Sequence, residues 1–289
     1  MILVTGATGN VGGRLVRELA AVGAPTRALV RTPEAAVSLR ELGVEAVVGA
    51  FEDADSLREA VSGVERVYVV SPAGADSLVG WQLPVVEAAR AAGVTHIVKQ
   101  SSIAADEPTE ASIVAAHRRI EEAIERSGIA WTHLRPHWFM QNELGQAGSI
   151  AADGVFYAPD VARISMIDVA DIAAVAARVL TSDGHEGTAY VVTGPEALSY
   201  ADLAGIYSRV LEREVTWQEV TFEQAQQAMS DGGLPEELAV GYTEILRRYS
   251  EGGVTERVSS AVPELLGRPA RTFEEFLQDH RDAYRSAGD

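Results

Sequence analysis

The chain has 289 residues, of which 47% are hydrophobic, and its formal net charge is −18 at pH 7. This length and apolar content suffice for one large α/β domain or for a domain with a smaller appendage. The negative charge disfavours nucleic acid and membrane surfaces as partners, and the absence of cysteine excludes disulfides, thiolate metal ligands and cysteine nucleophiles. The short apolar run at residues 1–6 resembles neither a signal peptide nor a membrane span, so we expect a cytoplasmic protein.

Short β-branched runs alternate with alanine-rich helical patterns through the first two thirds of the chain. This alternation predicts an α/β fold of the Rossmann type, a doubly wound parallel sheet whose apolar strands are buried on both faces. The predicted strands are residues 2–5, 26–30, 44–48, 66–70, 95–100, 130–135 and 188–193. The predicted helices are residues 11–22, 34–42, 55–62, 84–92, 111–127 and 169–180, with Pro84 as a first helical residue.

The periodicity becomes mostly helical after Gly194-Pro195. We therefore predict a Rossmann domain at residues 1–195 and a smaller, mostly helical substrate-binding subdomain at residues 196–289. Three pairs in or near this region match the capping box, in which a hydroxyl precedes a returning acceptor by three residues: Ser199 with Asp202, Thr221 with Gln224 and Thr272 with Glu275. The predicted helices are residues 201–211, 222–230, 235–250 and 273–286.

A glycine pattern lies between the first predicted strand and the first predicted helix. Gly6 permits a tight turn, Gly9 lets a pyrophosphate approach the backbone, and Gly12 allows close packing of the helix on the strand. The helix N-terminus then offers unpaired N–H groups and partial positive charge to the phosphates. The predicted dinucleotide contacts in this loop are Gly6, Thr8, Gly9, Asn10, Val11 and Gly12.

The end of the second predicted strand indicates which nicotinamide cofactor binds. A site for NAD needs a carboxylate there for the ribose hydroxyls, yet no Asp or Glu occurs between Glu18 and Glu34. The strand instead ends at Arg31, which either pairs with the 2′-phosphate of NADP(H) or is a solvated surface arginine. We therefore predict NADP(H). Asp53, just past the third strand, is either a ligand of the adenine amino group or an ordinary loop carboxylate.

Several separated blocks of the sequence resemble the NmrA-like branch of the atypical short-chain dehydrogenase/reductase superfamily. The resemblance implies a dinucleotide-binding Rossmann fold, and similar proteins include quinone and dye reductases, phenylpropanoid reductases and redox-sensing regulators. The blocks are TGATGNVG at 5–12, RALVR at 27–31, VYVVSP at 67–72, GVTHIVKQSS at 93–102, HRRIEEAIERSGIAWTHLRP at 117–136, WFMQN at 138–142, ISMIDVADIAAVAARVL at 164–180 and YVVTGPEALSYADLA at 190–204.

The catalytic Tyr and Lys pair of classical members of that superfamily is absent. Lys99 is the single lysine, and the residue four positions before it is Thr95 instead of tyrosine. We therefore expect the proton for any reduction to come from another group, or the substrate to tolerate negative charge, as a quinone does.

Polar residues at the carboxyl ends of strands are candidates for the chemistry, because ligands of open α/β sheets bind at that edge. Ser101 and Ser102 follow the fifth strand, and either face the substrate and cofactor or cap a turn. His117 falls on the apolar stripe of its helix, with Glu121 one turn later to orient it. The resemblance implies that the histidine at position 117 faces the nicotinamide ribose. The alternative is that His117 is a core histidine. Ser71, at the end of the VYVVSP block, is a further predicted cofactor contact.

The loop after the sixth strand mixes rings with hydrogen-bonding groups, which suits a flat aromatic ligand, although core packing explains its rings as well. His137 is the predicted proton donor because its ring can titrate near neutrality. Trp81 is either a residue that closes the same pocket or one buried at the surface. The predicted substrate contacts are Trp81, Trp138, Phe139, Met140, Gln141 and Asn142.

Taken together, these features predict an NADPH-dependent oxidoreductase acting on a hydrophobic aromatic ketone or quinone, possible as a homo-oligomer, with His137, His117 and Ser102 as catalytic residues. Two alternatives stay open: a non-catalytic NADP(H) sensor, and a recruited fold that oxygenates an aromatic quinol. No metal-ligand spacing is evident, so we predict no metal. Asp168 and Asp171 are predicted to be structural, as a helix cap and a neighbouring polar contact.

Overall fold

The computed structural model describes residues 1–72 and 74–285, which form two compact units. The first unit comprises Met1–Arg135 and Ile172–Val191, and the second comprises Pro136–Asp171 and the chain from Val192 onward. The C-terminal segment of the second unit thus begins at Val192, four residues before the predicted start at 196. The unit also takes residues 136–171, which the sequence placed in the Rossmann domain.

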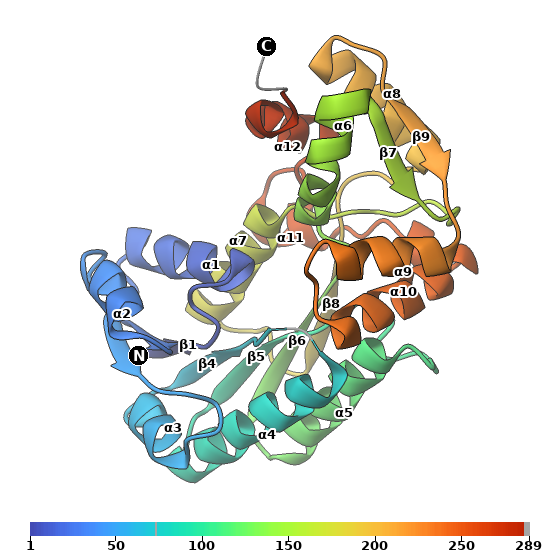
Figure 1. Ribbon diagram of the computed structural model, residues 1–289. Helices are drawn as coiled ribbons and strands as arrows, with labels where there is room; N and C mark the ends of the chain where they lie inside the picture. The colour runs from blue at the N-terminus through green and yellow to red at the C-terminus, as the bar shows by residue number, and fades with distance from the viewer. Residues whose placement is uncertain (73, 286–289) are drawn as a thin grey trace. The chain divides into compact units, whose positions relative to one another are not determined.

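A seven-stranded sheet forms the centre of the first unit (Figure 1), in the order β3-β2-β1-β4-β5-β6-β8. Neighbouring strands from β3 through β6 pair in parallel, which confirms the Rossmann-type fold. All residues of β1 and most of those in β4 and β5 are buried, as their continuous apolar sequence predicts. The strands are β1 Ile2–Val4, β2 Thr26–Val30, β3 Glu45–Val48, β4 Arg66–Val69, β5 His96–Gln100, β6 Ala130–Pro136 and β8 Thr188–Val192.

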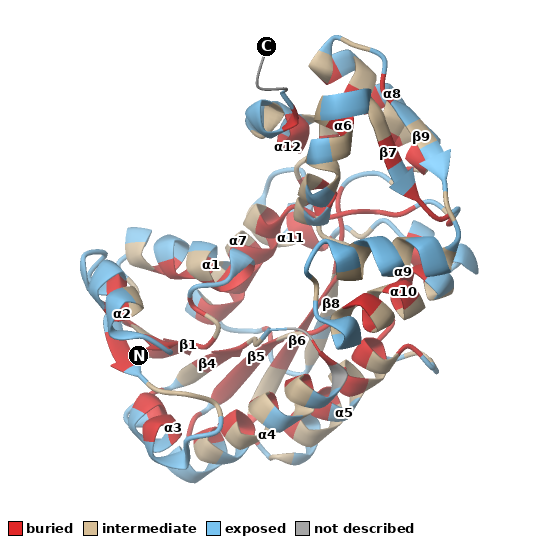
Figure 2. Cartoon of the chain, viewed as in Figure 1, coloured by how far each residue is buried: buried red, intermediate tan, exposed pale blue. Residues whose placement is uncertain are grey.

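Helices cover both faces of this sheet (Figure 1), with α3, α4 and α5 on one face and α1 and α7 on the other. Buried side chains gather on the strands and on the helix surfaces turned toward them (Figure 2), so the core of the unit has two layers, one on each side of the sheet. The helices are α1 Asn10–Ala21, α2 Pro33–Arg40, α3 Ala54–Val61, α4 Ala75–Ala92, α5 Ser112–Arg126 and α7 Val169–Thr181.

One predicted helix boundary is wrong. The sequence predicts that Pro84 begins a helix, but α4 starts at Ala75 and contains Pro84 in its interior. An interior proline leaves the carbonyl four residues earlier without its helical N–H partner, and here that residue is Gly80. Packing of α4 against α3 and α5 outweighs the local cost of the proline.

The direction of the strand order reverses between β1 and β4, and the turn after β1 lies against the end of β4 at this point. Thr5 links the two strands, because its hydroxyl donates to the Val70 carbonyl at 2.7 Å and accepts from the Val70 N–H at 2.9 Å. Gly6 has φ +57°, and a Cβ there would lie 2.9 Å from the Val70 side chain. Such a reversal is where open α/β sheets bind their ligands.

The second unit is mostly helical, as predicted, and all three predicted capping boxes are present. It also contains a parallel pair of four-residue strands, β7 Val155–Ala158 and β9 Thr216–Glu219, which the sequence does not predict. The predicted helix at 273–286 ends at Asp279 and is followed by the short η3, while residue 286 lies outside the described residues. The other elements are η1 Met140–Gln146, α6 Ala147–Asp153, α8 Tyr200–Leu211, α9 Phe222–Asp231, α10 Glu236–Ser250, η2 Val254–Glu256, α11 Ala261–Leu266, α12 Phe273–Asp279 and η3 Arg281–Tyr284.

Within residues 1–72 and 74–285, the structure has no helix that combines the length and the apolar character needed to span a membrane.

Two adjacent glycines of α1 test the close packing of this helix on the β1 turn. A Cβ at Gly12 would lie 2.2 Å from the Gly6 carbonyl oxygen, whereas a Cβ at Gly13 would have 3.4 Å to its nearest neighbour. We expect Gly12→Ala to lower the free energy of unfolding by roughly 1–3 kcal/mol through overpacking. Gly13→Ala should leave it unchanged or raise it by up to about 1 kcal/mol, because alanine favours the helix. Urea unfolding measures both, and equal effects would contradict this packing.

Candidate functional site

The first turn of α1 presents backbone N–H groups at the point where the strand order reverses. Gly9 is the N-cap, and among the described residues no side chain caps the helix. Val11 and Gly12 are buried, so a ligand at this turn reaches their backbone N–H groups rather than their side chains, whereas Thr8 and Asn10 are exposed. The helix also has no acidic residue in its first turn. The turn can therefore hold an anion by hydrogen bonds and by the helix dipole.

Arg31 and Asp53 differ in how much of their side chain is engaged. Arg31 is exposed directly after β2, which leaves its guanidinium accessible to an anion. Asp53 is the N-cap of α3, and its Oδ1 accepts a hydrogen bond from the Asp55 N–H at 3.0 Å. The cap supports the structural alternative for Asp53, while its contact with adenine stays a prediction.

Ser71 follows β4, and Trp81 lies on α4, where it contacts the loop after β3. The Ser71 hydroxyl accepts a hydrogen bond of 2.9 Å from the side chain of the buried Gln82, on α4. The side-chain amide oxygen of Gln82, Oε1, is buried with no hydrogen-bond partner among the described residues. Trp81 stacks on Phe51, with ring centroids 5.9 Å apart, and its indole N–H donates to Glu52. Both of these contacts of Trp81 are thus with the loop after β3.

Three candidate residues follow β5 or face it. The buried Ser101 donates its N–H to the Leu134 carbonyl at 2.6 Å, and the Ser102 hydroxyl donates to the Ile103 carbonyl at 3.2 Å. His117 is half-buried on α5, and its Nδ1 lies 2.8 Å from Nζ of Lys99. This last contact is a surprise, because the absence of a tyrosine partner left Lys99 without a predicted role.

Lys99 is fully buried, and its Nζ also donates to the Gln100 carbonyl at 2.7 Å. Burial lowers the pKa of Lys99 to about 7, against a smaller opposing effect of Glu121. Burial and the neighbouring Lys99 together hold the pKa of His117 well below its ordinary value. The amine is thus the group of this pair that exchanges a proton near neutrality.

The sequence predicted that Glu121 orients His117. In the structure Glu121 instead binds Arg135 on β6. The Arg135 guanidinium donates to both carboxylate oxygens, at 3.0 and 2.7 Å, and to Asp106 at 2.6 Å. Burial is the largest single effect and raises the pKa of Glu121, but the hydrogen bonds and charge of Arg135, together with smaller effects of His133 and Ser101, leave the pKa below its ordinary value. The pair links α5 to the strand that leads into residues 137–142.

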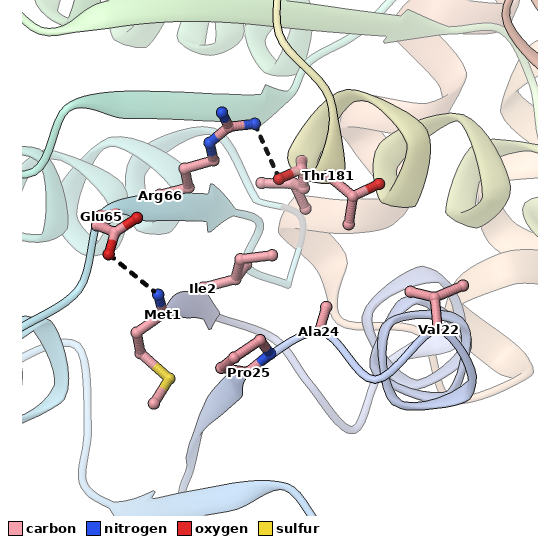
Figure 3. A pocket seen from close by; sticks show the side chains of 9 residues that line it. Met1, Ile2, Val22, Ala24, Pro25, Glu65, Arg66 and Thr181 are labelled. Carbon is pink, nitrogen blue, oxygen red and sulfur yellow. Dashed lines mark hydrogen bonds and ion pairs between the residues drawn. The ribbon is translucent and has the colours of Figure 1, made fainter.

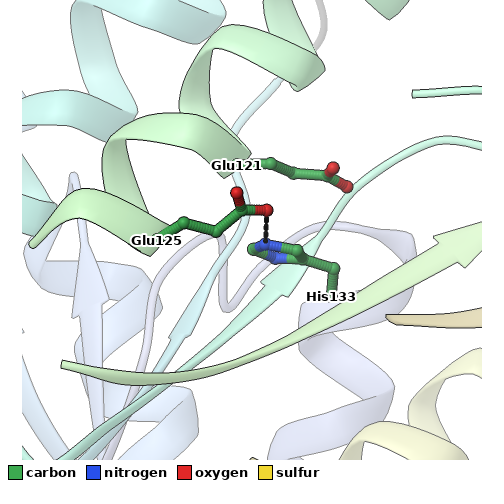
Figure 4. Close-up of side chains that lie close together, drawn as sticks. All are labelled: Glu121, Glu125 and His133. Carbon is green, nitrogen blue, oxygen red and sulfur yellow. Dashed lines mark ion pairs between the residues drawn. The ribbon is translucent and has the colours of Figure 1, made fainter. Parts of the chain in front are cut away.

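Glu121, Glu125 and His133 form a cluster whose possible ligand atoms lie within 4.8 Å of one another (Figure 4). His133 is fully buried, and its Nε2 lies 3.3 Å from Glu125 Oε1. A metal ion there would have to share Glu121 with the guanidinium that already holds both its oxygens, which is electrostatically unfavourable. The Glu121 carboxylate of this cluster is thus engaged by Arg135, and the absence of a metal stays a prediction.

In the second unit, His137 is held by hydrogen bonds that conflict with its predicted role. Nδ1 accepts the Trp138 N–H at 2.6 Å, and Nε2 lies 3.1 Å from the Thr255 carbonyl, so the ring is a neutral Nε2–H tautomer. Burial lowers the pKa of His137 to about 3. The expected titration near neutrality is therefore wrong, because both ring nitrogens are already used and the charged form is desolvated.

The predicted substrate residues divide into structural and accessible groups. Gln141 caps α7: its amide donates to Asp168 at 2.8 Å, and its carbonyl accepts the Val169 N–H at 3.1 Å. Met140 is buried, Phe139 is half-buried, and Asn142 is exposed. Trp138 is half-buried and meets two tyrosines edge-on, Tyr242 at 5.8 Å and Tyr249 at 6.2 Å between ring centroids.

The acidic residues of the IDVAD block are structural, as predicted. Asp168 accepts the Ala170 N–H at 2.9 Å at the start of α7 and pairs with Arg271, and Asp171 pairs with Arg268.

Glu143 is a titratable residue of the second unit that the sequence analysis did not single out. It is buried, its Oε1 accepts the Trp138 indole N–H at 3.2 Å, and burial raises its pKa to about 7. A carboxyl that is part protonated at neutral pH can donate a proton. Its position amid the apolar residues of the 138–146 segment is the signal that could have identified it.

A hollow of about 430 Å³ lies at the opposite, amino-terminal edge of the sheet of the first unit (Figure 3). Its charged groups are already paired: the Met1 ammonium lies 3.6 Å from Glu65, and Arg66 donates to the Leu180 carbonyl at 3.0 Å. Ligands of open α/β sheets bind at the carboxyl edge, so we do not assign the site here.

Several known proteins that are similar to this chain are reductases. The model of the NmrA-like family matches residues 1–277. An NAD(P)H azoreductase from Xenophilus azovorans is 40% identical over 99% of this chain and 100% of its own. The structure of an NADPH-dependent quinone oxidoreductase from Escherichia coli, complexed with NADPH, has a TM-score of 0.89 and 30% identity over 97% of this chain and 100% of that one. A triphenylmethane reductase from Citrobacter sp., complexed with NADP(H), has a TM-score of 0.86 and 28% identity over 96% and 99%.

Two neighbouring glutamates of α5 test the buried ion pair. Glu121→Gln removes the buried carboxylate partner of the Arg135 guanidinium and leaves only the exposed Asp106, so we expect a loss of roughly 3 kcal/mol in the free energy of unfolding at pH 7. Glu122→Gln, the matched control, breaks a half-exposed pair with Arg118 and should cost less than about 1 kcal/mol.

The difference should be pH-dependent. The pKa of Glu121 is lower in the folded chain, so its contribution is present above the ordinary carboxyl pKa and is lost as the pH falls through the folded value. Urea unfolding between pH 3 and pH 7 measures this, and a constant difference between wild type and Glu121→Gln would contradict the assignment.

Proposed function

Because this chain belongs to the NmrA-like family, we propose that it is an NADPH-dependent reductase of aromatic acceptors such as quinones. The observation that carries the proposal is the uncapped glycine turn where the strand order reverses, which is shaped to take a diphosphate. The azoreductase and quinone oxidoreductase among the similar proteins support the reaction class.

The residues of the first unit fit the cofactor. A Cβ at Gly9 would lie 3.3 Å from the Gly6 carbonyl oxygen, so the glycine keeps the turn tight and its surface bare for a phosphate. The N–H groups that follow Gly9 would hold the diphosphate, and Arg31 would hold the 2′-phosphate. Bound NADPH supplies a hydride, and the protein must orient the acceptor and provide any proton that it requires.

The second unit supports an aromatic acceptor. Trp138 is half-buried beside Tyr242 and Tyr249, so part of its ring surface remains available for packing against another ring. Glu143 accepts the hydrogen bond of the same indole N–H and so holds the orientation of the Trp138 ring. In this proposal Trp138 binds the acceptor, and His137 keeps the backbone of the loop in place.

Stopped-flow mixing of the NADPH complex with a panel of quinones, azo dyes and cationic triphenylmethane dyes tests the activity. We expect oxidation of NADPH at a rate that rises with acceptor concentration for at least one of these classes. Tight binding of NADPH with no acceleration by any acceptor would contradict the proposal and favour a redox sensor.

Arg31 should set the preference between the two nicotinamide cofactors. We expect Arg31→Ala to raise the Kd of NADPH by roughly 10- to 100-fold and to leave that of NADH unchanged, because only NADPH loses a charge-assisted contact worth about 1.5–3 kcal/mol. Arg90→Ala, which removes an exposed arginine near the C-terminal end of α4, is the control. Fluorescence titration measures both, and equal weakening of NADPH and NADH binding would contradict the assignment.

A further inference from the structure

Lys99 has contacts unlike those of a structural lysine. It is fully buried on β5, yet its Nζ pairs with no carboxylate at hydrogen-bond distance in the described chain; its partners are the Gln100 carbonyl and Nδ1 of His117. Burying a charged amine away from an opposite charge is costly, so such a residue is seldom placed in a core for stability alone. The contact with His117 is the one that a reaction can use.

The geometry of the pair determines where His117 carries its proton. When protonated Lys99 donates to Nδ1, the imidazole proton must lie on Nε2, on the side of the ring away from the lysine. Lys99 is fully buried, whereas His117 is only half-buried, so of the two residues His117 has the more accessible surface. In this arrangement His117 can donate the proton on Nε2, and the Lys99 ammonium can then supply a second proton to Nδ1.

We propose that Lys99 is a positioning residue that fixes His117 as an Nε2–H proton donor and restores its proton through Nδ1 during reduction of the acceptor. The proposal rests on the proposed function, since it assigns the proton that the missing Tyr and Lys pair would otherwise supply. The candidate donor shifts from His137, whose ring nitrogens are both occupied, to His117.

The proton transfers balance. After hydride reaches the acceptor, the Nε2–H bond of His117 breaks as an O–H or N–H bond forms on the reduced acceptor. A Nζ–H bond of Lys99 breaks as the Nδ1–H bond of His117 forms. The imidazole therefore ends neutral, Lys99 ends as a neutral amine, and a proton from water later restores the pair.

The charged surroundings keep the amine close to balance between its two forms. On α5 Glu121 favours the charged amine, but both its oxygens are held by Arg135 of β6. His133 lies beside Lys99 in the strand register, and burial lowers its pKa to about 4, so it stays neutral. The positive charge of Arg118, also on α5, further lowers the pKa of His133. Burial, which lowers the pKa of Lys99 to about 7, is thus offset only in part.

Two acceptors that differ in the charge left after hydride transfer test the proposal. A quinone gains a negative charge on oxygen with the hydride, so a proton delivered to that oxygen accelerates its reduction, whereas a cationic triphenylmethane dye takes the hydride on carbon and becomes neutral. We expect Lys99→Met to lower the ratio of the quinone rate to the dye rate by at least about tenfold, in the range of general acid catalysis. In the wild type the quinone rate should fall as the pH rises from 6 to 9, and in Lys99→Met this decline should disappear.

Matched variants separate this role from a structural one. Arg119→Met removes an exposed cation from the same helix and should leave the ratio and the pH profile unchanged. Lys99→Gln serves as a second variant if Lys99→Met does not fold, and NADPH binding verifies that each variant is intact. Equal losses with both acceptors, or a quinone rate and pH profile that do not change, would overturn the proposal.

A measurement without turnover separates this proposal from the proposed function. Nitrogen-15 NMR of the histidine rings at pH 6, with His117→Gln to assign the signal, should show His117 as the Nε2–H tautomer in the wild type and as a mixture in Lys99→Met. Should no acceptor be reduced by the wild type, the proposed function fails, and the NMR result alone decides the role of Lys99. A tautomer that is the same with and without Lys99 would refute it.

Discussion

The close approach of α1 to the turn after β1 is the constraint on which the candidate site depends. Gly12 lies so near Gly6 that a methyl group would overlap the Gly6 carbonyl, and Gly6 in turn lies against Val70. Thr5 holds the same two strands together with a buried hydroxyl. These contacts fix the helix N-terminus at the reversal of the strand order, where its N–H groups can meet a diphosphate.

A second layer of the site lies beneath the carboxyl end of β5. Glu121 and Arg135 form a fully paired network that joins α5 to β6, whereas Lys99 and His117 form a pair without a formal countercharge at hydrogen-bond distance in the described residues. The first arrangement provides rigidity, because each charge is satisfied. In the second, no carboxylate of the described residues lies within hydrogen-bond distance of the Lys99 amine, which is the basis for the proposed proton transfer through His117. The two arrangements share α5, so the rigid pair also positions the reactive one.

The sequence predicted the features that depend on local patterns. Apolar runs located all seven strands of the main sheet, and the three hydroxyl-acid or hydroxyl-amide pairs located helix caps. The predicted start of α4 was wrong because packing outweighed the local signal of Pro84, and β9, the partner of β7, was missed because it is mostly exposed and carries no apolar run. The roles of side chains depended on partners far along the chain. The Thr255 carbonyl hydrogen-bonds to His137, and Arg135 binds Glu121, which was predicted to orient His117. Lys99 contacts His117, which lies 18 residues later in the sequence. Periodicity does not reveal such partners.

Binding of the diphosphate at the first turn of α1 is the central claim, and isothermal titration calorimetry of NADPH tests it most directly. The account predicts saturable heat with one cofactor per chain at near-physiological salt, and an affinity that weakens as salt rises because the bound groups are anions. Absence of heat with both NADPH and NADP⁺ would contradict it, because the chain would then lack the hydride source on which the proposed reduction depends.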